Sequence, residues 1–391
     1  SEQSLVSKKT RPTLFDPPIE RRASDSTKWS RFSNKEHDVI GAWIADMDLP
    51  TSNNIINAIK GRLDERVFGY SEPPDEFFDV VIQRLEKKYG WKTKAEWFVP
   101  QPGVVPSLFF ASNCVGDTGD AVMAARPNYR YFLETAEHTG RVFQPIDCHV
   151  NQHRWEMDFD QMRQTISPKT KTFLLCNPHN PVGRILDQQE LETIADLCLR
   201  NGTMICADEI HADLVLDRDK QHIPIASLHP EIEKKSITLI SASKAFNLPA
   251  IGGLSLAIIP DPALRSAFQH KAYGVATHPG ALAYAATLTA FKDCDNWLLQ
   301  TISYLRDNRD YLEAQISGIE GLNMNHVEAT FLAWIDVSNS GLANPVSTFL
   351  DHGVALSDGA EMGRADHVRL NFACHRSTLE EIVRRLKASL A

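Results

Sequence analysis

The chain has 391 residues, of which 43% are hydrophobic and 23% are charged, and its net charge is −9. This composition is that of an ordinary globular protein, so it excludes intrinsic disorder and a small disulfide-bonded scaffold. The excess of acidic residues argues against a nucleic-acid-binding protein, which normally carries a basic face. No apolar run approaches the ~18 residues that a membrane helix needs, so we expect no membrane span.

Seven cysteines are present, an odd number, and none of them forms a C-x-x-C pair. Neither a disulfide framework nor a cysteine zinc site is therefore indicated. The first 22 residues are polar and charged, and they lack the apolar core of a secretory signal. Together these features predict a reducing, cytoplasmic setting.

The first ~40 residues are rich in charge, proline and serine, which predicts an extended arm that must dock to become ordered. Leu14 and Phe15 lie among these charges, and burial against a partner subunit would explain them. Apolar residues then recur at helical spacing from residue 51 and again over residues 74–89, so we expect two amphipathic helices there.

Short apolar runs alternate with helical segments through the middle of the chain. The runs cover residues 121–124, 141–145, 172–176, 204–207, 237–240 and 254–259, with helical segments such as 187–200 between them. Strands separated by helices predict an α/β fold with a mostly parallel sheet that is covered on both faces.

The last third of the chain has a different pattern. A helical tract begins at residue 281, and strands at 331–337 and 367–372 precede a closing helix at 378–390. This order predicts a smaller α+β domain, with a long helix over residues 281–316 as the hinge. We expect an N-terminal arm with part of the small domain in residues 1–50, a large domain in 51–285 and the small domain in 286–391.

Ligands of an open parallel sheet collect at the carboxyl ends of its strands. Asp208 comes directly after the buried run 204–207, and Glu209, His211 and Asp213 follow it. These residues predict either a polar strand end or a metal site. Side chains on a strand alternate between its two faces, however, so the four cannot meet at one ion without a bend.

Lys244 follows the run 237–240 and is flanked by Ser241 and Ser243. A lysine just beyond a buried strand has its pKa lowered by desolvation and can serve as an amine nucleophile. The two hydroxyl groups suit a phosphate, although a purely structural role for this short motif stays open.

Two further loops carry candidate ligand contacts. Residues 177–183 contain two X-Pro bonds and end in Gly183, which predicts a defined turn whose Asn180 amide can bind a ligand. Gly103 opens a helical run, and backbone N–H groups at a helix start bind phosphate. No lysine of a nucleotide-binding P-loop follows it.

Arg369 lies inside the apolar run 367–372. A buried arginine pairs with a planar anion, so either a substrate carboxylate or an internal salt bridge is expected.

Taken in order, these motifs resemble the fold type I pyridoxal-phosphate (PLP) enzymes of the aminotransferase class I/II superfamily, and most closely the MalY/PatB group of cystathionine β-lyase-like enzymes. Residues 45–48, 68–71, 222–224 and 369–374 add to this resemblance. It implies a large domain whose mostly parallel, seven-stranded type of sheet is sandwiched by helices. It also implies PLP as the cofactor and an amino acid as the substrate.

The resemblance implies a role for each matched residue. Lys244 would bind the cofactor covalently and move the Cα proton, and Asp208 would pair with the pyridine nitrogen. Arg369 would hold the substrate α-carboxylate. The remaining cofactor contacts would come from Val104, Val105, Tyr129, Asn180, His211, Ser241 and Ser243. Tyr70 would reach the phosphate of the neighbouring subunit, which implies a homodimer.

The implied reaction is a carbon–sulfur β-elimination from cystathionine or a cysteine S-conjugate, giving thiol, pyruvate and ammonia. An aminotransferase would use the same lysine, aspartate and arginine. A metal-dependent hydrolase built on Asp208, His211 and Asp213, and a regulatory PLP-binding protein, are more remote alternatives. Val182, His375 and the segment 356–363 depart from the family pattern. Because residues 357–363 lie near the substrate side in this family, the departure of that segment indicates a specialised substrate.

Overall fold

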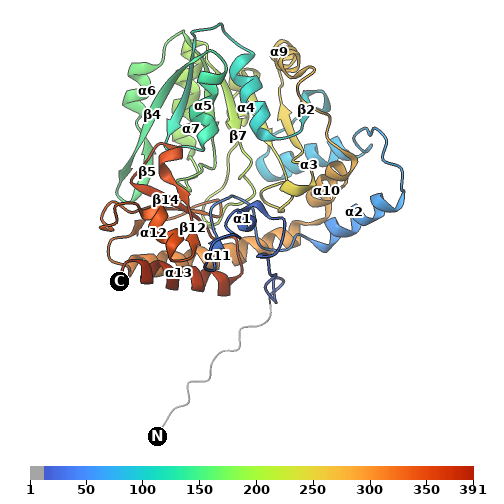
Figure 1. The fold of residues 1–391 in the computed structure, drawn as a ribbon. Coiled ribbons are helices and arrows are strands. Elements are labelled where there is room, and N and C mark those ends of the chain that lie inside the picture. The colour runs from blue at the N-terminus through green and yellow to red at the C-terminus, as the bar shows by residue number, and fades with distance from the viewer. Residues whose placement is uncertain (1–12) are drawn as a thin grey trace.

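The computed structural model describes residues 13–391, and their largest feature is an eight-stranded sheet (Figure 1). In spatial order its strands are β2 (Phe98–Gln101), β9 (Ser255–Ile258), β8 (Ser236–Ile240), β7 (Met204–Asp208), β6 (Thr170–Cys176), β3 (Ala121–Arg126), β4 (Val142–Asn151) and β5 (Arg154–Met157). The five strands from β8 to β4 are parallel, whereas β9 and β5 run in the opposite direction. The predicted mostly parallel sheet is confirmed, and the edge strand β5 brings the number of strands to eight.

Alternating side chains of the central strands build a separate core on each face of this sheet. Leu174 and Cys206 pack beneath one layer of helices, formed by α4 (Val104–Asn113), α5 (Arg130–His138) and α9 (Pro262–Ala272). Phe173 and Ile205 face the other layer, formed by α6 (Phe159–Thr165), α7 (Gln188–Asn201) and α8 (Pro230–Lys234). Burial on both faces explains why these strands read as continuous apolar runs in the sequence.

The start of α7 shows how the sequence sets the ends of its helices. The Asp187 carboxylate accepts a hydrogen bond from the Glu190 backbone N–H, and the Glu190 carboxylate accepts one from the Asp187 N–H. This capping box satisfies two amides that the first turn would leave unpaired. Gly202 ends the helix with a φ of 67°, a left-handed conformation that favours glycine.

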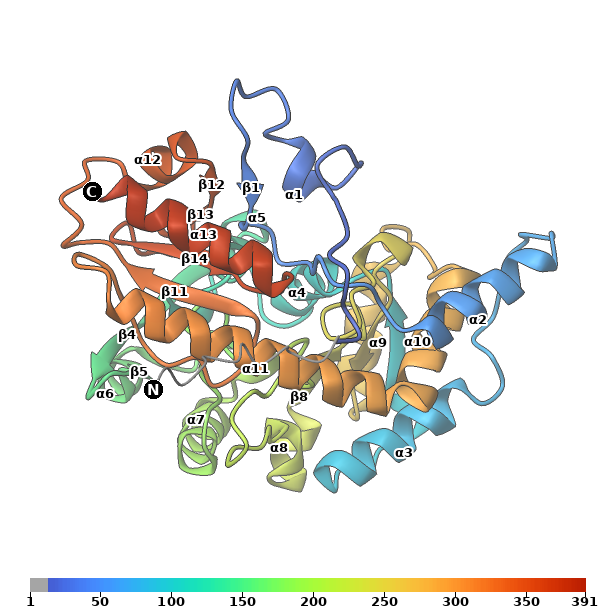
Figure 2. The same ribbon diagram turned by 90° about the horizontal axis from the view of Figure 1, so that it is seen from below.

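A second, four-stranded sheet lies in the C-terminal part of the chain. Its order is β10 (Asn323–Met324), β11 (Leu332–Asp336), β14 (His367–Asn371) and β13 (Ser357–Asp358). The helices α11 (Asp295–Ser317), α12 (Pro345–Asp351) and α13 (Arg376–Ser389) accompany it, and α11 and α13 lie side by side in Figure 2. Near the N-terminus, β1 (Ile40–Gly41) pairs with β12 (Val354–Ala355), and α1 spans Thr27–Ser30.

The predicted long helix over residues 281–316 is divided into two. Helix α10 (Ala281–Asp293) packs against α2 (Asn53–Asp64) and α3 (Phe77–Tyr89), whereas α11 begins at Asp295. Cys294 between them has φ −115° and ψ 19°, outside the helical range. Residues 13–391 also contain short 3-10 helices at Ala95–Trp97, Ile225–Ser227, Pro249–Ile251 and Gly359–Met362. The three-part domain division stays a prediction.

The described part of the N-terminal arm packs on its own chain. Phe15 is buried against Trp297 and Tyr304, with ring centroids 6.3 and 4.9 Å apart. Burial against a partner subunit is therefore not needed to explain Phe15, because α11 supplies the aromatic surface, whereas Leu14 is exposed. The part of the arm in residues 1–12 lies outside the described residues. Among residues 13–391, no helix combines the length and apolar character that a membrane crossing requires.

Candidate active site

Three neighbouring parallel strands bring the predicted site residues to one edge of the large sheet. Strands β6, β7 and β8 are adjacent and end at Cys176, Asp208 and Ile240. The loop that carries Asn180, the residues from Asp208 to His211, and the loop that carries Lys244 therefore start side by side. The prediction that these three motifs share one end of the sheet agrees with this placement.

Lys244 is half-buried, and its Nζ donates a hydrogen bond to the backbone carbonyl of Ala45 over 2.6 Å. Burial lowers the pKa of Lys244 to about 8, and the guanidinium charge of Arg369 acts in the same direction. A lysine with this pKa is partly unprotonated near neutrality, which a nucleophilic amine requires.

Asp208 is buried, and burial raises the pKa of its carboxyl group to about 7. Its Oδ1 accepts a hydrogen bond from the Ile210 N–H at 3.1 Å. The next carboxylate, Glu209, instead faces His222, whose Nε2 lies 3.0 Å from Glu209 Oε1. Asp208 is therefore a buried acid that needs a cation to stay ionised, and a protonated pyridine nitrogen is such a cation.

His211 is also buried, and its Nδ1 has no hydrogen-bond partner among the described residues. Burial lowers the pKa of His211 to about 3, with Lys244 and Arg369 adding to the effect, so the imidazole is neutral. A buried nitrogen without a partner costs free energy unless a ligand satisfies it. This orphaned atom fits a bound polar cofactor.

The Arg369 side chain extends from β14 of the four-stranded sheet to the loop that carries Asn180. Its Nη1 donates to Asn180 Oδ1 at 3.1 Å, and its Nη2 donates to the Trp43 carbonyl at 2.9 Å. Burial lowers its pKa to about 10. Within residues 13–391 no carboxylate lies at salt-bridge distance from Arg369, and its Nε has no partner. Arg369 therefore does not form the internal salt bridge that was the alternative expectation. Its guanidinium group is instead suited to the carboxylate of a ligand.

The residues assigned to the phosphate lie on two loops. Val104 and Val105 form the first turn of α4, directly after Gly103. On the other loop, Ser241 Oγ donates to the Leu254 carbonyl at 2.7 Å and lies 3.1 Å from Ser243 Oγ. The free amides of a helix start together with hydroxyl groups suit a phosphate.

Tyr129 and Tyr70 occupy very different surroundings. Tyr129 precedes α5, and its N–H donates to the Asn180 carbonyl at 3.2 Å. Burial raises its pKa to about 12, so its ring is neutral. Tyr70 is fully exposed and lines a groove of ≈ 1230 Å³ together with Tyr273 and His278. Among residues 13–391, no other side chain therefore covers the Tyr70 ring.

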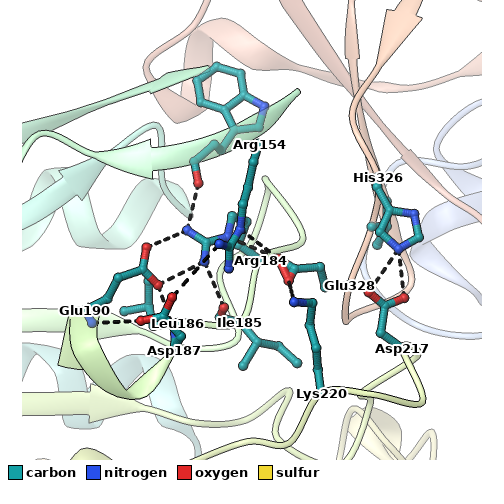
Figure 3. A network of polar contacts seen from close by, with 12 residues as sticks. Arg154, Arg184, Ile185, Leu186, Asp187, Glu190, Asp217, Lys220, His326 and Glu328 are labelled. Atoms are coloured by element: carbon teal, nitrogen blue, oxygen red, sulfur yellow. Dashed lines mark hydrogen bonds and ion pairs between the residues drawn. The ribbon is translucent and has the colours of Figure 1, made fainter. Parts of the chain in front are cut away.

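A buried ionic network links the Asn180 loop to the segment before β11 (Figure 3). Arg184 pairs with Glu190 at 2.8 Å and with Glu328 at 3.1 Å. The Glu328 N–H donates to the Gly183 carbonyl at 2.8 Å. His326 pairs with Asp217 in the same region, as Figure 3 also shows. Sequence reasoning missed this network, although an arginine directly after the Asn-Pro turn was a visible signal.

The metal-site alternative finds no support in the side-chain positions. The Asp213 carboxylate is held by Arg84 at 3.1 Å and by Lys88, and these cations lower its pKa. In the described part of the chain, no three His, Cys, Asp or Glu side chains are grouped as metal ligands.

Known proteins match this chain along nearly its whole length. A family model for aminotransferase class I and II matches residues 41–386. Cystathionine beta-lyase PatB of Bacillus subtilis is 33% identical over 96% of this chain and 100% of its own length. The crystal structure of OvoB superimposes with a TM-score of 0.92 at 39% identity, covering 95% of this chain and 98% of that one.

Cystalysin of Treponema denticola, whose crystal structure contains pyridoxal 5'-phosphate, has a TM-score of 0.92 at 27% identity and covers 97% of this chain and 99% of its own. By comparison, aspartate aminotransferase of Geobacillus stearothermophilus is 23% identical over 90% of this chain. The predictions of the family and the cofactor are confirmed. The chain belongs to the aminotransferase class I and II family and is a pyridoxal-phosphate-dependent enzyme.

Proposed function

We propose that this enzyme is a carbon–sulfur β-lyase that acts on cystathionine or another cysteine S-conjugate. The observation that carries the proposal is that one site holds both Lys244, an amine of lowered pKa, and Arg369, a buried guanidinium with no carboxylate at salt-bridge distance among residues 13–391. Together they suit an α-amino acid. The lyase is preferred to an aminotransferase because a cystathionine beta-lyase is the relative at 33% identity, against 23% for the aspartate aminotransferase.

The bound cofactor supplies a ring that accepts electrons from the substrate Cα. We assign Asp208 as the partner of the pyridine nitrogen. Asn180 would bind the phenolic oxygen of the ring, with His211 nearby. Tyr129 would stack on the ring. The backbone amides of Val104 and Val105, with Ser241 and Ser243, would hold the phosphate.

The chemistry then needs two bond cleavages at the substrate. Arg369 holds the α-carboxylate, Lys244 removes the proton from Cα, and the electron pair left on Cα expels a thiolate from Cβ. The thiolate leaves as a thiol after taking up a proton. Water converts the remaining three-carbon fragment into pyruvate and ammonia. Sulfur is a good leaving group, so little acid assistance is required.

The active unit is proposed to be a homodimer. Val67, Phe68, Tyr70, Tyr273 and Val275 are strongly exposed apolar or aromatic residues, from 64 to 110% of their reference areas. Tyr70 and Tyr273 line the same groove. Large exposed apolar patches typically mark protein interfaces. A second copy of the chain seated there would bring Tyr70 to the phosphate of its neighbour.

Purified enzyme is expected to be yellow and to release pyruvate and a free thiol from cystathionine without any keto acid. The Lys244→Ala variant should lose both the reaction and the borohydride-reducible absorption band. As a control, Lys292→Ala, which removes an exposed lysine paired with Glu76, should keep both. Turnover only after addition of a keto acid would identify an aminotransferase instead. A colourless wild-type protein that binds no added cofactor would contradict the assigned cofactor site.

A further inference from the structure

Residues 43–49 form a backbone segment on which the main active-site side chains converge. Its carbonyl groups accept hydrogen bonds from Arg369 at Trp43 and from Lys244 at Ala45. The other side-chain donors to these carbonyl groups are Ser357 at Trp43, Asn371 at Ile44 and Asp46, Asn247 at Met47 and Leu49, and Lys28 at Asp46. The position of this segment therefore sets the position of both Lys244 and Arg369.

Lys28 is the charged group that holds this segment from the N-terminal side. Its side chain is only 1% exposed. Its Nζ lies 2.8 Å from Asp46 Oδ1 and 3.1 Å from Asp48 Oδ2, and it donates to the Asp46 carbonyl at 3.0 Å. A lysine is rarely buried to this degree unless it is paired. Three oxygen partners satisfy the three protons of the ammonium group.

Helix α1, which carries Lys28, is fixed to the same segment by its neighbours. Trp29 Nε1 donates to Asp48 Oδ1 at 3.0 Å, and Trp43 Nε1 donates to the Lys28 carbonyl at 2.9 Å. A Cβ atom at Gly41 would collide with the Lys28 carbonyl, so the close approach of β1 requires a glycine. In Figure 2, α1 lies beside β1.

We propose that Lys28 is a positioning residue for Lys244. Its ammonium group keeps the Ala45 carbonyl within reach of the Lys244 amine and balances the negative charge of Asp46 beside that amine. The arm that carries Lys28 is thereby part of the active site. This inference rests on the proposed function only in taking Lys244 as the reactive amine.

The charged groups around Lys244 determine in which direction its pKa shifts when Lys28 or Asp46 is replaced. The charged and titratable groups that face its amine are Arg369, Asp46, Asp208, Lys28 and His211. Arg369 and Lys28 lower the pKa of Lys244, whereas Asp46 and Asp208 raise it. Replacing Lys28 by a neutral residue removes one cation and also leaves the Asp46 charge unbalanced. Both changes raise the pKa of Lys244.

The test compares Lys28→Met, Asp46→Asn and the double variant in two measurements. The first is the pH dependence of acetic anhydride labelling of Lys244 in cofactor-stripped protein, followed by mass spectrometry. The second is the pH dependence of the visible absorption band of the holoenzyme. Lys28→Met should raise the pH midpoint of both the labelling and the absorption change by about one unit. Asp46→Asn should lower these midpoints by a similar amount. The double variant should return close to wild type.

A purely structural role would lower thermal stability in these variants without moving the midpoints in opposite directions. Midpoints that stay at the wild-type value in both single variants would overturn the proposal. If Lys28→Met does not fold, Asp46→Asn decides the matter, because its Lys28 keeps Asp48 as a partner. A wild-type midpoint in that variant overturns the inference. A missing visible band would instead count against the proposed function, since labelling does not depend on the cofactor.

Discussion

At the scale of single residues, burial is the main influence on the charged groups of the site. It raises the pKa of Asp208 to about 7 and lowers that of Lys244 to about 8 and that of His211 to about 3. These shifts keep the His211 imidazole uncharged and bring the pKa values of the Asp208 carboxyl group and the Lys244 amine close to neutral pH. Perturbed groups that lie together in this way are typical of active sites rather than of structural ion pairs.

Asp208 gives a prediction about stability in the absence of cofactor. Its pKa rises from 3.8 to about 7 on folding, so the folded state holds the proton more tightly than the unfolded state. The free energy of unfolding therefore falls as pH rises from about 4 to about 7. Asp208→Asn removes this dependence. Between pH 5 and pH 8, the stripped variant should lose about 3 kcal/mol less stability than the stripped wild type.

Urea denaturation of both stripped proteins at the two pH values measures this difference. With cofactor bound, the order should reverse, because the variant lacks the anion that pairs with the pyridine nitrogen. Identical pH dependence in the two stripped proteins would show that the Asp208 carboxyl is not desolvated as the structure indicates.

At the scale of elements, one short segment connects the two loops that carry Asn180 and His211. Glu328 and Ala329 donate their N–H groups to the Gly183 carbonyl, and Thr330 donates to the Leu214 carbonyl. The next residue, Phe331, packs edge-on against the His211 ring at 6.3 Å. The segment 328–331 therefore links the ends of β6 and β7 to the start of β11.

Glu328→Gln should weaken this link, because Arg184 would then keep only Glu190 as a buried carboxylate partner. Removing one partner of a buried ion pair leaves a poorly compensated charge, so we expect a loss of about 3 kcal/mol in the free energy of unfolding. Faster loss of cofactor on dialysis should accompany it. The matched control is Glu76→Gln, whose partner Lys292 is exposed, and its loss should stay below about 1 kcal/mol. Equal losses in both variants would contradict the link.

The elements also show what the sequence can and cannot predict. The apolar runs that became β6, β7 and β8 predicted the parallel centre of the sheet, because strands buried on both faces are rich in apolar residues along their whole length. The strands β2 and β5 gave no such signal, because each has only four residues and these include polar ones or a proline. The break at Cys294 was hidden because apolar residues continue at helical spacing on both sides of it.

The same limit applies to the candidate site. Asp208, Lys244 and Asn180 were visible because Asp208 ends an apolar strand and the other two lie four residues beyond one. Side-chain contacts across long sequence distances have no local pattern, and so the partnership of Lys28 with Asp46 and Asp48, and that of Arg184 with Glu328, appear only in the fold. The roles given to the individual residues stay predictions.

At the scale of the whole molecule, the positive charge gathered at the active site is opposite in sign to the net charge of the chain. The chain carries a net charge of −9, yet its cofactor and the substrate carboxylate are both anionic. The cationic groups Arg369, Lys244 and Lys28 therefore gather around one segment, together with backbone amides at the start of α4. Concentrating positive charge at one site lets an acidic protein bind anions.

The apolar groove beside Tyr70 yields the prediction at this scale. Val275 is 71% exposed and follows Tyr273, one of the groove residues. A charged side chain buried in an interface must be desolvated without a partner, so Val275→Arg, beside the groove, should shift the proposed dimer to monomer in sedimentation experiments. Because Tyr70 would no longer reach the neighbouring phosphate, the monomer should also bind cofactor at least about tenfold more weakly.

Val150→Arg is the matched control, because Val150 is 50% exposed in β4, which lies next to the edge strand β5, on the opposite side of the sheet from β2. The control should remain dimeric and yellow. If Val275→Arg stays dimeric, the groove is not the subunit interface. If it becomes monomeric with unchanged cofactor affinity, the interface is correct but Tyr70 does not contribute to the phosphate site, and each subunit then carries a complete site of its own.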